Sequence, residues 1–81
     1  MTINMINTLI EFADQFDDGE GYVKKHDAIG GWTLEEREVM CSIHASNFHI
    51  RTIEALRKRG LIRHVKDGFH MITPEGFSVI L

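Results

Sequence analysis

Over the first sixteen residues, apolar positions recur among polar ones at intervals of three and four. This interval is the period of an α-helix with one buried face, so the pattern predicts a helix over residues 2–16. Asp17-Asp18-Gly19 is expected to end it, and residues 17–32 to form a glycine-rich loop with a short extended piece at 22–24. Trp32 is expected to fill the core. The apolar helix positions are Ile3, Ile6, Leu9, Ile10, Ala13 and Phe16.

Two further apolar residues, Met5 and Phe12, widen the stripe of this helix beyond the needs of one small core. One interpretation is a homodimer formed through Met5, Leu9, Phe12 and Phe16. The other is that these side chains cover the loop that follows. The pattern leaves both interpretations open.

A second helix is expected from Thr33 to about His44, because Thr33 and Glu36 have the spacing of a capping box. Its apolar face would consist of Leu34, Val39, Met40 and Ile43. The link over residues 44–47 is short enough to form the corner of a helix-turn-helix.

Ser46 or Asn47 is expected to cap a third helix, because both types favour that position. The third helix is expected to turn Ile50, Ile53 and Leu56 inward.

Turn residues divide the stretch after this helix into a hairpin and a new helix start. Gly60 suits the position after a helix end, and Leu61-Ile62 opens an apolar strand. Asp67-Gly68 favours a two-residue type I′ turn, since both central positions of that turn need positive φ. Thr73-Pro74-Glu75 has the order of N-cap, first-turn proline and first-turn acid. The order is helix, strand, tight turn, strand, helix.

Residues 52–76 resemble the winged helix-turn-helix regulators, including MarR-like ones. In these proteins the recognition helix ends in a run like T-x-x-x-L-x-x-x-G-L-I and the wing in T-P-x-G, as residues 52–62 and 73–76 do here. The resemblance covers about a third of the chain. It implies one domain over residues 1–81, mainly α with a small β-hairpin: three helices and a two-stranded wing, with a short helical turn after Thr73.

A recognition helix presents its N-terminal polar residues to base edges in the major groove. The candidate base contacts are Asn47, His49, Arg51 and Thr52, because arginine can pair with guanine, asparagine with adenine, and threonine with a base or the thymine methyl. The candidate phosphate contacts are Arg57, Lys58, Arg63 and Lys66. A solvated polar helix face with a basic end that complements the helix dipole is the simpler alternative.

Charged residues are distributed unevenly along the chain. The net charge of −3 disfavours a polyanion partner for the molecule as a whole. Residues 1–48 carry three basic and nine acidic side chains, for −6, whereas residues 49–81 carry six basic and three acidic ones, for +3. An acidic half and a basic half would orient the molecule on nucleic acid. Asp67 at the expected wing tip is unfavourable beside phosphate, so the wing is expected to contribute little.

Composition and the remaining motifs narrow the other functions to be considered. The chain has 43% hydrophobic and 26% charged residues, with no apolar run long enough for a bilayer and no secretory signal, so a cytoplasmic protein is expected. The single cysteine, Cys41, is expected to be a small core residue. Residues 16–27 resemble a calcium loop, but Phe16 would stand at the first ligand position.

The five histidines do not form clustered pairs of the kind that bind zinc, so no metal or other cofactor is expected. No nucleophile and base, carboxylate dyad or phosphate-binding glycine loop stands out, so an enzyme is not expected. The sequence therefore favours a small sequence-specific regulator that binds duplex DNA. The alternative is a winged-helix module that binds another protein through its acidic N-terminal half.

Overall fold

The computed structural model describes residues 1–27 and 31–81, with residues 18–27 described by their backbone. Its helices and strands are α1 (Ile3–Asp27), α2 (Leu34–Met40), β1 (Ile43–His44), the 3-10 turn η1 (Ala45–Asn47), α3 (Ile50–Lys58), β2 (Ile62–Lys66), β3 (Phe69–Ile72) and α4 (Pro74–Ile80). The protein is mainly helical with a small antiparallel sheet of strand order β1-β3-β2. The expected hairpin is confirmed, and β1 adds a third strand to it.

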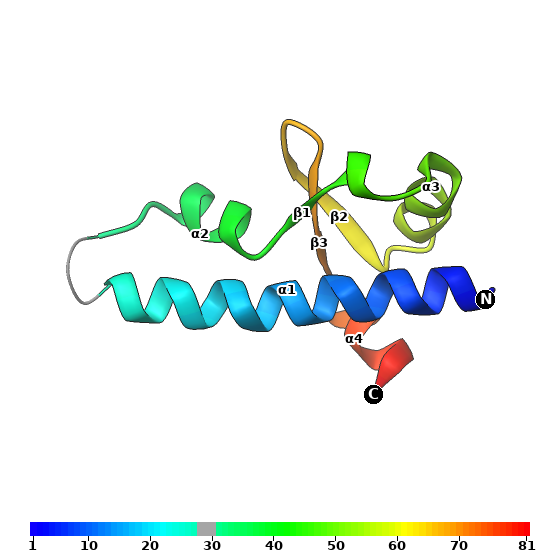
Figure 1. Ribbon diagram of the computed structural model, residues 1–81, viewed down its shortest axis with the longest axis horizontal. Helices are drawn as coiled ribbons and strands as arrows, with labels where there is room; N and C mark the ends of the chain where they lie inside the picture. Colours follow the sequence, from blue (N-terminus) through cyan, green and yellow to red (C-terminus); the bar gives the residue numbers. More distant parts are fainter. Residues whose placement is uncertain (28–30) are drawn as a thin grey trace.

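The long helix α1 supports the rest of the fold. Figure 1 shows α2 above the C-terminal half of α1, and α3 with the sheet above its N-terminal half. The last helix, α4, lies on the other side of α1 in this view and contacts both α1 and β3. One helix therefore joins an α2 region to a region made of α3, the hairpin and α4.

The core forms where α1 meets α3 and the sheet. Leu9 and Phe12 of α1 are completely buried, as is Leu56 of α3, and Ile62 of β2 is 1% exposed. Phe12 stacks on Phe48 with ring centroids 5.3 Å apart. The buried cluster comprises Met5, Leu9, Phe12, Ala13, Ile53, Leu56, Leu61, Ile62 and Ile72.

The buried stripe of α1 differs from the expected one. Ile3 and Ile10 were expected to face inward, but they are 68% and 42% exposed. Met5, Leu9 and Phe12 lie at the i, i+4 and i+7 positions and define the true inner face.

The homodimer prediction assigned four side chains to a contact between copies. Met5, Leu9 and Phe12 are instead buried in the core, and Phe16 packs edge-on against Phe77 of α4 at 5.3 Å. The extra width of the stripe is used within the chain, because α1 contacts α3, β3 and α4 at once. A homodimer therefore stays a prediction, but not through these four side chains.

The first helix continues past its expected end. We expected Asp17-Asp18-Gly19 to stop it and residues 22–24 to be extended, but α1 runs to Asp27. An established helix gains one hydrogen bond per residue as it extends, which can outweigh a glycine cost of about 1 kcal/mol. The helical backbone also excludes a calcium loop with a sharp turn at Gly21. The remaining part of the expected loop, residues 28–30, lies outside the described residues.

The second helix ends earlier than expected. The capping box at its start is confirmed, since Thr33 Oγ1 accepts a hydrogen bond from Glu36 N (3.1 Å) and Thr33 N donates to the Glu36 carboxylate (3.3 Å). At its end, Ser42 donates from Oγ to Val39 O (2.6 Å), a local bond that competes with the helix. Ile43 then pairs with His70 of β3.

The expected helix-turn-helix corner at residues 44–47 is therefore wrong. β1 and the single turn η1 separate α2 from α3. The third helix is capped by His49, and not by Ser46 or Asn47.

The local predictions around the hairpin are confirmed. Gly60, Asp67 and Gly68 have φ of 72°, 48° and 84°. Thr73 caps α4 by accepting from Gly76 N (3.1 Å) and donates from the same hydroxyl to Gly60 O (2.6 Å). The start of α4 is thereby tied to the end of α3. Gly76 must be small, since a Cβ there would collide with the carbonyl oxygen of Leu61.

Within residues 1–27 and 31–81, no helix combines the length and apolar character needed to cross a membrane.

Candidate nucleic-acid interface

Helix α3 has one buried and one solvent-exposed face. Ile53 and Leu56 face the core, at 3% and 0% exposure. The exposed positions are Ile50, Arg51, Glu54, Arg57 and Lys58. The helix ends at Arg59, whose N–H donates to Ala55 O (3.2 Å), and Gly60 follows in the left-handed conformation. The exposed face therefore carries three cations, one acid and one large apolar side chain.

Three of the four predicted base contacts surround the start of α3. Arg51 is exposed in the first turn, and His49 precedes it as N-cap. His49 Nδ1 accepts a hydrogen bond from Arg51 N (3.2 Å), so Nε2 is the nitrogen that can donate elsewhere. Asn47 is exposed in η1, before the helix, and its Nδ2 donates to His44 O (3.2 Å).

The fourth predicted base contact points elsewhere. Thr52 is half-buried and lines a hollow of about 230 Å³ together with Asn7, Thr8 and Glu11 of α1. Consecutive helical residues are about 100° apart around the axis, so Thr52 cannot share the face of Glu54 and Lys58. His49 lines the same hollow, so Thr52 and the N-cap of α3 both lie beside α1.

Ile50 is a surface residue that sequence reasoning placed in the core. Its side chain is 67% exposed, between His49 and Arg51. Spacing from Ile53 suggested an inward position, but the buried face is centred on Ile53 and Leu56, and Ile50 lies beyond its edge. A helical wheel centred on those two residues would have identified it.

The four predicted phosphate contacts fall into two pairs. Arg57 and Lys58 are exposed at the end of α3, and among the described residues no ion pair joins either of them to an acid. Lys66 at the end of β2 lies 3.0 Å from Glu35 of α2. The hydrogen bond and the charge of Glu35 raise the pKa of Lys66 above its usual value.

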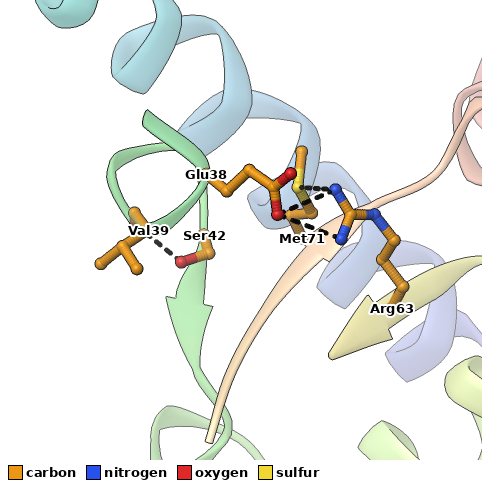
Figure 2. Close-up of polar contacts among 5 residues, drawn as sticks. All are labelled: Glu38, Val39, Ser42, Arg63 and Met71. Carbon is orange, nitrogen blue, oxygen red and sulfur yellow. Dashed lines mark hydrogen bonds and ion pairs between the residues drawn. The ribbon is translucent and has the colours of Figure 1, made fainter. Parts of the chain in front are cut away.

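Arg63 is the second cation held by α2. Figure 2 shows its guanidinium facing Glu38, with Nη1 and Nη2 each 3.2 Å from Glu38 Oε2. Nη2 also lies 3.1 Å from the sulfur of Met71 on β3. Both cations of the wing strand are therefore already paired, whereas no ion pair among the described residues involves Arg51, Arg57 or Lys58 of α3.

A buried histidine lies in the sheet beneath this surface. His70 of β3 is 3% exposed, and its Nδ1 donates to Gly68 O (3.0 Å), because a carbonyl oxygen can only accept. Within the described residues its buried Nε2 has no hydrogen-bond partner. Burial lowers the pKa of His70; the hydrogen bond to Gly68 O opposes this shift, and the nearby charges of His64, Arg57 and His44 add to it. His70 is thus held neutral.

Other candidate chemistry is limited. Cys41 is buried at the end of α2, as expected for a small core residue. Among the described residues, no three histidine, cysteine or carboxylate side chains are grouped so that they could hold a metal ion.

Comparison with protein-family models, curated proteins and solved structures gave no significant match.

Proposed function

We propose that the protein is a small winged-helix regulator that binds duplex DNA through the exposed face of α3. The observation that carries the proposal is the pair of unpaired cations, Arg57 and Lys58, which lie on the same helix as Arg51. A helix of nine residues followed by an antiparallel hairpin also has the element order of a winged helix. The net charge of +3 over residues 49–81 agrees with a polyanion partner.

In this proposal the N-terminal end of α3 enters the major groove. Arg51 would bind guanine with two hydrogen bonds, and Asn47 would bind adenine. Ile50 would contact the methyl group of thymine, which explains an exposed isoleucine between two polar side chains. Arg57 and Lys58 would contact phosphates and set the register without reading sequence.

The wing has a small part in this proposal, as the sequence also suggested. Arg63 and Lys66 are paired with Glu38 and Glu35, and a phosphate must displace those carboxylates to reach them. Asp67 at the hairpin turn adds a negative charge beside Lys66. DNA binding should therefore depend on α3 far more than on β2.

Paired variants of equal charge test the proposal. Arg57→Ala with Lys58→Ala and Arg63→Ala with Lys66→Ala each remove two positive charges, but only the first pair removes unpaired cations. Each phosphate contact contributes about 0.9 to the slope of log affinity against log salt. The first double variant should lower the magnitude of that slope by nearly the contribution of two phosphate contacts. The second double variant should lower it by distinctly less.

Fluorescence anisotropy with a labelled duplex at several salt concentrations measures the slope, and circular dichroism confirms that each variant is folded. Equal effects of the two double variants would contradict a binding face on α3. After selection of a preferred site, Arg51→Ala should cost about 1–3 kcal/mol at one base position.

A protein partner is the second candidate, and the neutralised wing favours it. The two cations of β2 are already paired with α2, and Leu34 on α2 is 73% exposed. A surface of this kind suits a protein partner better than a phosphate backbone. Recovery of one stoichiometric protein in a pull-down that survives nuclease treatment would support this function over DNA binding.

A further inference from the structure

A hollow of about 520 Å³ lies between α2 and the hairpin, away from the face of α3. Its apolar wall consists of Trp32, Val39 and Met40 at α2, together with Phe69 at the start of β3. Small-molecule pockets are typically about 300–1,000 Å³ and are lined by apolar and aromatic side chains. The hollow therefore has the size and the wall of a ligand site.

The side chains that α2 contributes to the apolar wall are only partly buried. α2 contains no buried residue, and Val39 and Met40 are only half-buried. The helix lies against α1, where Gln15 Nε2 donates a hydrogen bond to Met40 O (3.2 Å), and Glu35 and Glu38 form ion pairs with β2. The hollow lies beside these contacts, between α2 and the hairpin turn.

The charges that line the hollow are predominantly negative. They are the carboxylates of Glu35, Glu36 and Asp67 and the ammonium group of Lys66, which leave a formal charge of −2. Among the described residues of this lining Lys66 is the one cation, and its Nζ lies 3.0 Å from Glu35 Oε1. The carboxylate of Glu36 accepts the backbone N–H of Thr33 in the capping box.

We propose that this hollow binds a hydrophobic organic cation. The aromatic rings of Trp32 and Phe69 supply apolar surface and π-faces, both of which attract an organic cation. The carboxylates of Glu36 and Asp67 supply the complementary charge at the rim. An anionic ligand of the same shape would meet two carboxylates and a lysine that is already paired, so it should be rejected.

The proposal does not depend on DNA binding, because it uses none of the residues assigned to the nucleic-acid interface except Lys66. Occupation of the hollow would nevertheless bring a ligand against Glu35 and Lys66, the contact that joins α2 to the wing. A ligand there would be placed to alter how tightly α2 holds β2.

Two probes of nearly identical shape and opposite charge give a direct test with the complete chain. Tetraphenylphosphonium is a hydrophobic cation, and tetraphenylborate is the matching anion. Trp32 is the single tryptophan of the chain and lies in the wall, so its fluorescence reports occupancy. The cation should change the fluorescence in a saturable manner and bind at least tenfold more tightly than the anion.

Variants localise the binding. Asp67→Asn removes a carboxylate, and asparagine tolerates the positive φ of 48° at this turn position, so affinity for the cation should fall about threefold. Phe69→Leu removes one ring, and affinity should fall about fivefold. Glu54→Gln on the exposed face of α3 removes a carboxylate outside the hollow and should leave affinity unchanged.

Equal binding of the two probes would overturn the proposal, as would a cation affinity that falls no further in Asp67→Asn and Phe69→Leu than in Glu54→Gln. Loss of the folded state in Phe69→Leu would be visible by circular dichroism, and Asp67→Asn then decides the test alone. Because the readout is the fluorescence of Trp32 without DNA, failure here is distinguishable from failure of the proposed DNA binding.

Discussion

Helices α2 and α3 are both short, but they are held in place by different forces. α3 places Ile53 and Leu56 in the core, at 3% and 0% exposure. α2 buries no side chain; it lies against α1, with a hydrogen bond from Gln15 to Met40 O, and forms two ion pairs with β2. Exposed ion pairs contribute at most about 1 kcal/mol each, whereas a fully buried leucine contributes several. α3 is thus part of the core, and α2 is attached to it.

The difference separates two roles within one small fold. Buried apolar contacts hold α3, β2, β3 and α4 together. The hydroxyl of Thr73 also joins the end of α3 to the start of α4. The carboxylates of Glu38 and Glu35 on α2 pair with Arg63 and Lys66, the two cations of β2.

Truncation of one leucine in each helix tests this comparison most strongly. Leu56→Ala should lower the free energy of unfolding by about 2–5 kcal/mol, because it opens a cavity in the core. Leu34→Ala should change it by less than about 0.5 kcal/mol, since that side chain is 73% exposed. Urea unfolding followed by circular dichroism measures both. Similar losses in the two variants would show that α2 is as firmly packed as α3.

The pH dependence of stability tests the burial of His70 in the sheet. The pKa of His70 is lowered in the folded state, so the unfolded chain binds a proton more readily. Stability from this residue should be complete above pH 6.5, the ordinary histidine value, and be lost as pH falls from 6.5 through the lowered pKa of the folded state.

Urea unfolding between pH 8 and pH 5 measures this effect, and His70→Leu should flatten the profile. His49→Gln, at an exposed position, is the control for general histidine titration. A slope in His70→Leu equal to that of the unchanged chain would contradict a buried neutral histidine.

Removal of the carboxylates of α2 is expected to have the smallest effect on stability. Glu35→Gln with Glu38→Gln should lower the free energy of unfolding only slightly, because both ion pairs are largely exposed and screened by solvent. If DNA is the partner, the same change should tighten binding and steepen the salt slope by up to about 0.9 for each cation released.

The matched control removes two acids that lie far from the wing cations. Glu11→Gln with Glu75→Gln changes the net charge equally, at exposed positions of α1 and α4. Anisotropy titrations with a labelled duplex compare the two. The same gain in affinity from both double variants would mean that only net charge matters, and that α2 does not cover the wing.

Features set by neighbouring residues were predictable from the sequence. The capping box of Thr33, the Asp67-Gly68 turn and the start of α4 at Thr73 each depend on side chains within three positions, and each is confirmed. The class of fold, mainly helical with a small hairpin, follows from the same local signals.

Features set by distant residues were not predictable from the sequence. β1 is only two residues long and exists because β3 offers an edge 25 or more residues away. Arg63 and Glu38 are also 25 positions apart, so no local pattern indicated their ion pair. The inner face of α1 was misjudged because the partners that bury Met5 and Phe12 come from α3, the sheet and the segment before α3.

DNA binding by α3 can be tested by an amide-resolved NMR titration of the chain with a random-sequence duplex at low salt, followed by added salt. We expect shifts concentrated over residues 47–59, weaker shifts over residues 62–66, and reversal of both by salt, since screening weakens phosphate contacts. Unmoved spectra, or shifts confined to the acidic residues of α1 and α2, would contradict DNA binding by α3 and favour a protein partner.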